Sequence, residues 1–129
     1  MDEHSKIRVL IVEDANLVRR YYRETLEEAG YQVEEALNGS EALEKLMMRP
    51  TDLLIVDVNM PQMDGFTFLQ TLRRKDLPLS SIPALIASTE SEPQDFAAGR
   101  AAGGNFYITK PVTPEKLTEY VALLSGRLD

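Results

Sequence analysis

Hydrophobic and polar positions divide the chain into two kinds of segment, short apolar runs and longer stretches with helical periodicity. The apolar runs are nearly continuous and rich in β-branched residues, which is typical of strands that are buried on both faces. They predict five strands, at residues 7–12, 32–36, 52–57, 83–87 and 105–109. After each run, apolar side chains recur every three or four positions, and this pattern predicts five helices.

The predicted helices have apolar stripes and recognisable ends. Gly30 is a stop signal after the first helix. Residues 91–94 predict a capping box with a proline in the first turn of the fourth helix, which also contains Gly99. Thr113 and Pro114 predict the start of the fifth helix. The stripes consist of Leu17, Val18, Tyr21, Tyr22, Leu26 and Ala29, then Ala42, Leu43, Leu46 and Met47, then Phe66, Leu69 and Leu72, and finally Leu117, Val121 and Leu124.

Strict alternation of strands and helices predicts the fold class. Buried strands joined by helical crossovers form a parallel sheet that is covered on both faces. We therefore expect an α/β fold, a doubly wound five-stranded parallel sheet with five helices, of the flavodoxin-like type. We expect a single domain over residues 1–129, with a core of about residues 6–127 and no output domain. In such sheets the functional site lies at the carboxyl ends of the strands.

Composition and charge narrow the function classes. The chain has no cysteine, so disulfides and thiolate metal sites are excluded, and the polar, acidic start lacks the features of a secretory signal. No apolar run approaches the roughly 20 residues that span a membrane. The formal net charge is −7 and no basic stripe is present, which argues against nucleic-acid binding. We expect a cytoplasmic protein that binds neither membrane nor nucleic acid, most simply as a monomer.

Several chemically active side chains follow the predicted strands, and parallel strands bring their carboxyl ends to one rim. These residues are Glu13, Asp14, Asp57, Asn59, Ser88, Thr89 and Lys110. Each alone has an ordinary explanation, as a helix-start acid, a strand-end cap, a turn residue or a surface lysine. Three clustered carboxylates repel one another and require a cation, for which Mg²⁺ is suited by its preference for oxygen ligands. A carboxylate can attack phosphorus, and a lysine and a hydroxyl can stabilise the phosphoryl oxygens.

Five stretches of the sequence resemble the receiver domain of bacterial two-component systems, and the resemblance covers essentially the whole chain. They are VLIVED at 9–14, LIVDVNMPQMDG at 54–65, IPALIAS at 82–88, Ala102–Gly103 and YITKP at 107–111. The resemblance implies that Asp57 is the phosphoacceptor and that Lys110 pairs with the phosphoryl group. It implies a Mg²⁺ site, a cis Lys110–Pro111 peptide and a switch formed by Ser88 and Tyr107. The implied metal ligands are Glu13, Asp14, Asp57 and the backbone carbonyl of Asn59.

Among receivers, the sequence is most similar to the stand-alone, CheY-like chemotaxis regulators. The features that carry this similarity are Asn-Met-Pro at residues 59–61 and Glu90. It implies a chemotaxis-type histidine kinase as phosphodonor, and a flagellar motor switch protein and a phosphatase as further partners. Output would be binding through the face formed by the fourth helix, fifth strand and fifth helix. Such a protein is not an enzyme, although it assists its own phosphorylation and dephosphorylation.

The sequence departs from the commonest receiver pattern at three positions, where Glu13 replaces aspartate, Ser88 replaces threonine and Thr89 replaces a smaller residue. The resemblance implies that the bulk of the side chain at position 89 affects water access to the acyl phosphate, and that Asn59 and Glu90 also modulate its lifetime. We therefore expect Thr89 to change that lifetime.

Four alternatives to a chemotaxis switch remain at this point. A single-domain receiver could act as a phosphate sink or a phosphorelay intermediate. A haloacid-dehalogenase-like phosphatase would need an aspartate where the chain has Asn59. A nucleotide- or flavin-binding domain would need a glycine-rich first loop, which is missing. A pseudo-receiver would bind partners without phosphorylation, although every expected site residue is present.

Overall fold

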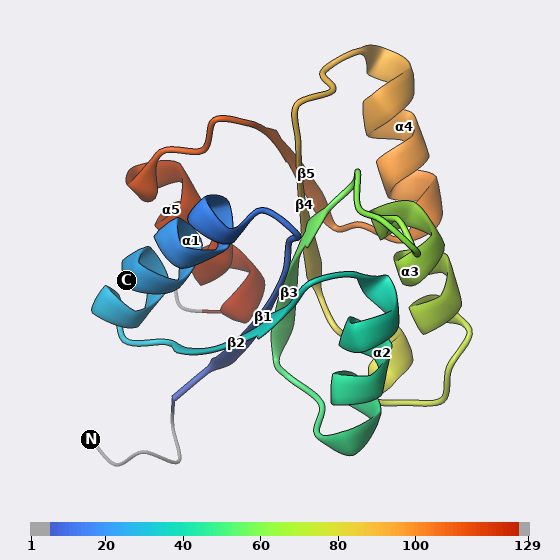
Figure 1. The fold of residues 1–129 in the computed structure, drawn as a ribbon, viewed down its shortest axis with the longest axis horizontal. Helices are drawn as coiled ribbons and strands as arrows, with labels where there is room; N and C mark the ends of the chain where they lie inside the picture. Colours follow the sequence, from blue (N-terminus) through green and yellow to red (C-terminus); the bar gives the residue numbers. More distant parts are fainter. Residues whose placement is uncertain (1–5, 127–129) are drawn as a thin grey trace.

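The computed structural model describes residues 6–126. Its centre is one parallel sheet with the strand order β2-β1-β3-β4-β5, which confirms the predicted fold class (Figure 1). Strand β3, which ends at the predicted phosphoacceptor, lies in the middle of the sheet. The strands are β1 (Arg8–Val12), β2 (Gln32–Ala36), β3 (Leu53–Asp57), β4 (Ala84–Ser88) and β5 (Phe106–Thr109).

Helices cover both faces of the sheet. Two of them pack on one face and three on the other, as Figure 1 shows. The first pair is α1 (Asn16–Glu28) and α5 (Pro114–Ser125), and the other three are α2 (Gly39–Met48), α3 (Gly65–Arg73) and α4 (Pro93–Ala102). A short 3₁₀ helix, η2 (Leu79–Ser81), precedes β4. Among the described residues, no helix combines the length and hydropathy that crossing a membrane requires.

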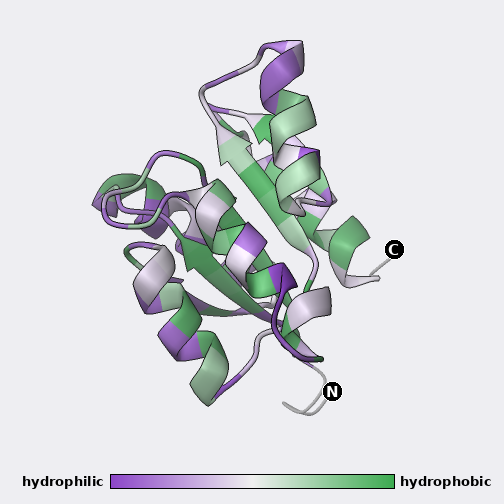
Figure 2. Cartoon of the chain, turned by 90° about the vertical axis from the view of Figure 1, so that its right-hand side faces the viewer, coloured by the Kyte–Doolittle hydropathy of each residue, from purple (hydrophilic) through white to green (hydrophobic). Residues whose placement is uncertain are grey.

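The core has two halves because successive side chains of a strand point to opposite faces of the sheet. In β1, Val9 and Ile11 pack toward α1 and α5, whereas Leu10 and Val12 pack toward the other three helices. All four side chains are fully buried. Figure 2 shows the result, with hydrophobic strands at the centre and hydrophilic residues on the outer faces of the helices. The two packed faces hold the strand ends in fixed positions.

Three residues assigned to apolar stripes are exposed instead of buried. Leu17 is 79% exposed and Met47 is 62% exposed, so these two predictions were wrong. Consecutive positions of an α-helix point about 100° apart. The buried direction of α1 is therefore taken by Tyr22 and Leu26, and that of α2 by Leu46, which leaves the neighbouring positions to solvent. Ala29, at the end of the first stripe, is also exposed.

Helix ends agree with the sequence except at α4. Thr113 caps α5 by accepting a hydrogen bond from the Lys116 N–H, as predicted. The capping box of α4 starts at Glu92 instead of Ser91, and the Asp95 carboxylate accepts from the Glu92 N–H at 2.9 Å. Pro93 therefore occupies the first helical position. The short acidic side chain three residues after the cap completes the box, which the predicted pairing did not include.

Candidate functional site

Three carboxylates meet at the rim where the parallel strands end. Glu13 and Asp14 follow β1, and Asp57 is the last residue of β3. One oxygen from each carboxylate lies within 4.8 Å of the others, a spacing that can hold a metal ion. Glu13 and Asp57 are buried, whereas Asp14 is exposed. The structure therefore brings together the three acidic side chains that the sequence placed at one rim.

Lys110 lies between the two buried carboxylates. Its Nζ donates to Glu13 Oε1 at 2.9 Å and to Asp57 Oδ1 at 3.1 Å. The other oxygen of Glu13, Oε2, accepts a hydrogen bond from the Ala15 N–H at 3.1 Å. The Lys110–Pro111 peptide is cis, as predicted. One cation thus bridges the phosphoacceptor candidate and a metal-ligand candidate.

Burial dominates the electrostatics of this cluster. It raises the pKa of Glu13 and of Asp57 above their usual values, and the contacts with Lys110 offset only part of this effect. For Lys110, burial alone would lower the pKa, but the hydrogen bonds and charges of Glu13 and Asp57 outweigh it and raise the pKa. The lysine is therefore charged at neutral pH. The two buried carboxylates have lost hydration, and their contacts with Lys110 only partly replace the stabilisation that water would give.

The donor set fits a hard divalent cation. Carboxylate oxygens are the side-chain ligands that Mg²⁺ prefers, and the exposed Asp14 leaves one side of the cluster open for the water molecules that Mg²⁺ retains. Glu13, Asp14 and Asp57 are the residues that could hold it. Asn59 lies in the exposed loop two residues beyond β3, so its carbonyl remains a predicted ligand.

A glycine allows the loop after β3 to turn closely against the phosphoacceptor candidate. A Cβ atom at Gly65 would lie 2.2 Å from the backbone oxygen of Asp57, a contact that is sterically impossible without displacement of the chain. The Gly65 N–H donates to the Val58 carbonyl at 2.9 Å, which closes the loop. The glycine in this sequence motif therefore has a steric role beside Asp57.

Ser88 and Tyr107 are linked through the main chain of one residue. Ser88 is 0% exposed at the end of β4, and its Oγ accepts a hydrogen bond from the Glu90 N–H at 3.1 Å. The Tyr107 hydroxyl donates to the Glu90 carbonyl at 2.9 Å. The Lys110 N–H, at the end of β5, donates to the Ser88 carbonyl at 2.8 Å. The rim and the aromatic side chain are thus connected by short, directional contacts.

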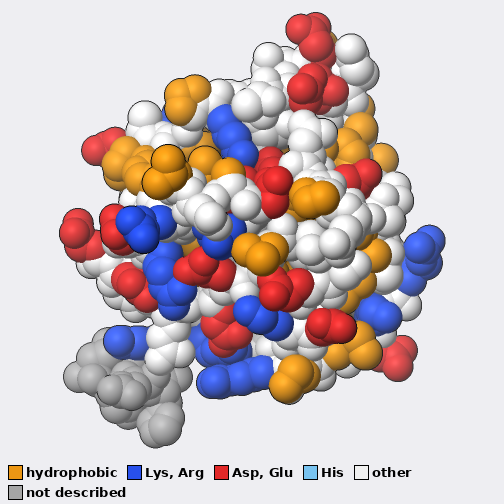
Figure 3. All heavy atoms as spheres, viewed as in Figure 1, with side chains coloured by type: hydrophobic (Ala, Val, Ile, Leu, Met, Phe, Trp, Pro, Cys, Tyr) orange, Lys and Arg blue, Asp and Glu red, His pale blue; other side chains and the backbone are white. Residues whose placement is uncertain are grey.

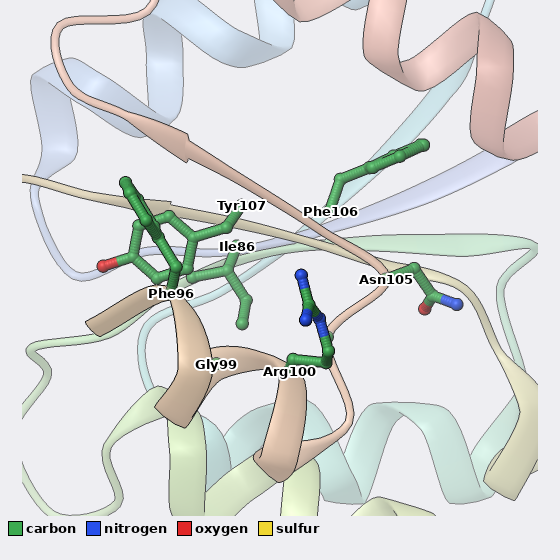
Figure 4. A pocket seen from close by; sticks show the side chains of 8 residues that line it. Ile86, Phe96, Gly99, Arg100, Asn105, Phe106 and Tyr107 are labelled. Atoms are coloured by element: carbon green, nitrogen blue, oxygen red, sulfur yellow. The ribbon is translucent and has the colours of Figure 1, made fainter. Parts of the chain in front are cut away.

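The ring of Tyr107 borders a hollow between α4 and β5, shown in Figure 4. It contacts Phe96 edge to face, with ring centroids 4.7 Å apart and planes at 80°. The hollow has a volume of about 270 Å³, and its lining includes Gly99 and Arg100 of α4. Phe96 and Phe106, which also line it, are exposed. This part of the surface combines apolar side chains with a cation.

The three predicted modulating residues, Asn59, Thr89 and Glu90, are all exposed. Thr89 borders a mostly apolar hollow of about 360 Å³ beside Lys110, together with Tyr21 and Pro111. The structure places Asn59 and Glu90 in the loops after β3 and β4. Their side chains are therefore accessible to whatever approaches the rim.

Sequence analysis missed Arg19. Its guanidinium donates to the backbone oxygen of Glu13, and it pairs with the carboxylate of Glu35 on β2. The only sequence feature that pointed to it was a basic residue early in the first helix, five residues after Asp14. Arg20 and Arg23 lie on the same helix, so this feature did not single out Arg19.

This arrangement, a doubly wound sheet with an acidic cluster and a lysine at its rim, is that of a phosphoacceptor signalling domain. Residues 9–122 match the response regulator receiver domain family, and the chain belongs to that family. Proteins of this family are phosphoacceptors in two-component signalling, interact with histidine kinases and typically bind Mg²⁺ at an acidic site.

Within the family, the chain is similar to CheY-type chemotaxis regulators. It is 37% identical to the chemotaxis protein CheY1 of Helicobacter pylori over 125 residues, which are 95% of this chain and 100% of that protein. It is also 35% identical to the sensor protein EvgS of Escherichia coli over 119 residues, which are 92% of this chain and 10% of that protein.

Solved structures show the same relationship. CheY4 of Vibrio cholerae superposes with a TM-score of 0.86 at 36% identity, covering 93% of this chain and 99% of the other. The receiver domain of a signal transduction histidine kinase from Syntrophus aciditrophicus gives 0.86 at 34% identity, covering 95% and 92%.

Proposed function

We propose that the chain is a phosphorylation switch in which Asp57 accepts a phosphoryl group from the phosphohistidine of a histidine kinase. The observation that carries this proposal is the Asp57 carboxylate itself. It lies at the open rim of the sheet, contacts Lys110 Nζ at 3.1 Å and shares a cluster with Glu13 and Asp14. A nucleophile, a fixed cation and a set of metal ligands are therefore adjacent.

The transfer follows from this geometry. An oxygen of Asp57 attacks phosphorus, the bond from phosphorus to the histidine nitrogen breaks, and the electron pair stays on the imidazole. Lys110 is already within hydrogen-bonding distance of Asp57 and stabilises the charge on the phosphoryl oxygens. Mg²⁺, held by Glu13, Asp14, Asp57 and the Asn59 carbonyl, would supply further charge neutralisation when bound. The same groups would assist hydrolysis, which makes the chain a self-assisting phosphoacceptor.

The output would be phosphorylation-dependent binding. The Ser88 hydroxyl would turn from the Glu90 N–H toward a phosphoryl oxygen, and Tyr107 would move inward from its present contact with the Glu90 carbonyl. That movement would reshape the surface formed by α4, β5 and α5. Phosphorylation would shift an equilibrium between two existing conformations.

The relatives support chemotaxis as the process. CheY1 and CheY4 are named as chemotaxis proteins, and the chain aligns with nearly all of each. We propose a chemotaxis-type histidine kinase as donor, and a flagellar motor switch protein and a phosphatase as partners of a monomeric cytoplasmic protein. Use as a phosphate sink or a phosphorelay intermediate is the second candidate, because the chain also matches receivers that belong to larger sensor proteins.

The test is intact-mass measurement after incubation with acetyl phosphate and Mg²⁺. Wild type should gain one phosphoryl group, and both Asp57→Asn and omission of Mg²⁺ should abolish the adduct. Asp52→Asn is the matched control, because Asp52 is an exposed aspartate just before β3 and should leave the adduct unchanged. A wild-type protein that forms no adduct and binds no beryllofluoride would overturn the proposal in favour of a pseudo-receiver.

A further inference from the structure

The guanidinium group of Arg19 connects three elements at the rim. Its Nε donates to Glu35 Oε1 on β2 at 2.7 Å, its Nη1 donates to the Glu13 carbonyl after β1 at 2.9 Å, and its Nη2 donates to Asn16 Oδ1 at the start of α1 at 2.6 Å. The side chain is only 12% exposed. A planar, multiply bonded guanidinium fixes the relative positions of its acceptors.

In the loop after β1, the side chain of Glu13 is held by its own hydrogen bonds, whereas the side chain of Asp14 is not. Both carboxylate oxygens of Glu13 are already bonded, to Lys110 and to the Ala15 N–H. The Asp14 carboxylate is exposed and has no comparable hydrogen bond within residues 6–126. Its direction depends on the peptide that joins Glu13 to Asp14, and the oxygen of that peptide is the one that Arg19 bonds.

Glu35, the acceptor of Arg19 on β2, is itself held in place by other residues. Glu35 also pairs with Arg23, and its backbone oxygen accepts a hydrogen bond from Lys45 on α2. Burial opposes the charge of Glu35, but the two arginines outweigh it and hold the pKa of this carboxyl below its usual value. Arg19 is thus anchored on an ionised side chain that Arg23 also holds, on a residue whose main chain is bonded by α2.

We propose that Arg19 is a positioning residue for the metal site: by fixing the peptide between Glu13 and Asp14 against β2, it aims Asp14 at the cation and sets the affinity for Mg²⁺. This rests on the proposed function, in which that site binds Mg²⁺. Residues that orient metal ligands without touching the metal typically contribute 10–100-fold in affinity.

The experiment titrates Mg²⁺ alone into the full chain and follows the backbone amide signals of residues 13–15 and 57–59 by NMR. Arg19→Gln should weaken Mg²⁺ binding by about tenfold or more. Arg19→Lys should recover part of this loss, because an ammonium can reach one acceptor but not three. Arg20→Gln is the matched control: it removes the neighbouring, exposed arginine of α1, which contacts neither the loop nor Glu35, and its Kd should stay within about twofold of wild type.

Thermal unfolding of each variant without metal separates affinity from stability. If Arg19→Gln binds Mg²⁺ as tightly as wild type, or if Arg20→Gln is weakened equally, the inference is overturned while the proposed function stands. If wild type itself binds no Mg²⁺, the metal site of the proposed function fails as well. Weaker binding in Arg19→Gln alone, in a chain that remains folded, supports the positioning role.

Discussion

At the scale of single residues, the rim places charged groups where water cannot fully solvate them. Burial raises the pKa of Asp57 because the ionised carboxylate loses hydration. The hydrogen bond and charge of Lys110 lower the pKa, but they offset only part of this rise. A group whose pKa is raised on folding stabilises the protein when protonated, and this contribution is lost as the pH rises through the folded-state pKa. Ionised Asp57 therefore lowers the stability of the metal-free fold at neutral pH.

Asp57→Asn should consequently make the metal-free protein more stable at pH 7, because the amide carries no charge to desolvate. Its advantage over wild type should shrink as the pH falls toward 3.8, the ordinary pKa of aspartate, where the wild-type carboxyl is protonated as well. Urea unfolding of both proteins from pH 7 to pH 4, without divalent ions, measures this difference. If the Asp57→Asn variant is less stable than wild type at pH 7, the ion pair with Lys110 outweighs desolvation.

Residue types and strand positions were enough to predict which side chains gather at the rim, but not which contacts they make with their neighbours. Asp57, Lys110 and the two acids after β1 could be predicted because parallel strands align their carboxyl ends. The roles of Arg19 and Gly65 depend on which backbone oxygen lies opposite each of them. That proximity arises from the tertiary fold, and no periodicity in the sequence encodes it.

At the scale of elements, α4 and β5 fit together at a single glycine. A Cβ atom at Gly99 would lie 2.8 Å from Tyr107 Cδ2 and 3.1 Å from Ile86 Cδ1. Glycine inside a helix costs about 1 kcal/mol relative to alanine. The helix therefore contains a residue that weakens it locally and gives the tyrosine ring its space.

Gly99→Ala should destabilise the protein by up to about 2 kcal/mol, because overpacking costs about 1–3 kcal/mol and the gain in helix propensity offsets about 1 kcal/mol of it. Urea unfolding measures the change, and NMR of the Tyr107 ring should show it displaced from Phe96. The control is Ala98→Gly at an exposed position of the same helix, which should cost about 1 kcal/mol through propensity alone. A Gly99→Ala variant that is more stable than wild type, with an unmoved ring, would contradict this account.

Element boundaries were predicted to within about two residues, and the errors have local causes. The capping box of α4 begins one residue later than predicted, because the Asp95 carboxylate reaches back to accept from the Glu92 N–H. Helix η2 was missed because a three-residue helix has no periodicity to detect. Leu17 and Met47 were misplaced because the apolar pattern is wider than the stripe that the sheet covers: both are exposed, beside Val18 and Leu46, which pack against the core.

At the scale of the whole molecule, charge is distributed without a dominant basic area on the face drawn in Figure 3, where acidic and basic side chains are interspersed. The chain carries a formal net charge of −7, and part of that excess is concentrated in the cluster of Glu13, Asp14 and Asp57. A divalent cation bound there would relieve local repulsion in the folded state only.

Mg²⁺ should therefore raise the melting temperature of wild type, by an amount corresponding to about 2.7 kcal/mol when its concentration is 100 times Kd. Asp14→Asn should remove most of this increase, because it replaces the exposed carboxylate of the cluster. Thermal unfolding in MgCl₂ and in NaCl of equal ionic strength distinguishes specific binding from screening. Equal shifts in the two salts would contradict a metal site.

The connection from the rim to the aromatic ring uses only main-chain atoms at residue 90. Ser88 accepts from its N–H and Tyr107 donates to its carbonyl, so every amino acid except proline presents the same two partners. The side chain at this position is exposed and takes no part in either bond. The side chain at position 90 can therefore change during evolution without loss of the two hydrogen bonds that connect Ser88 to Tyr107.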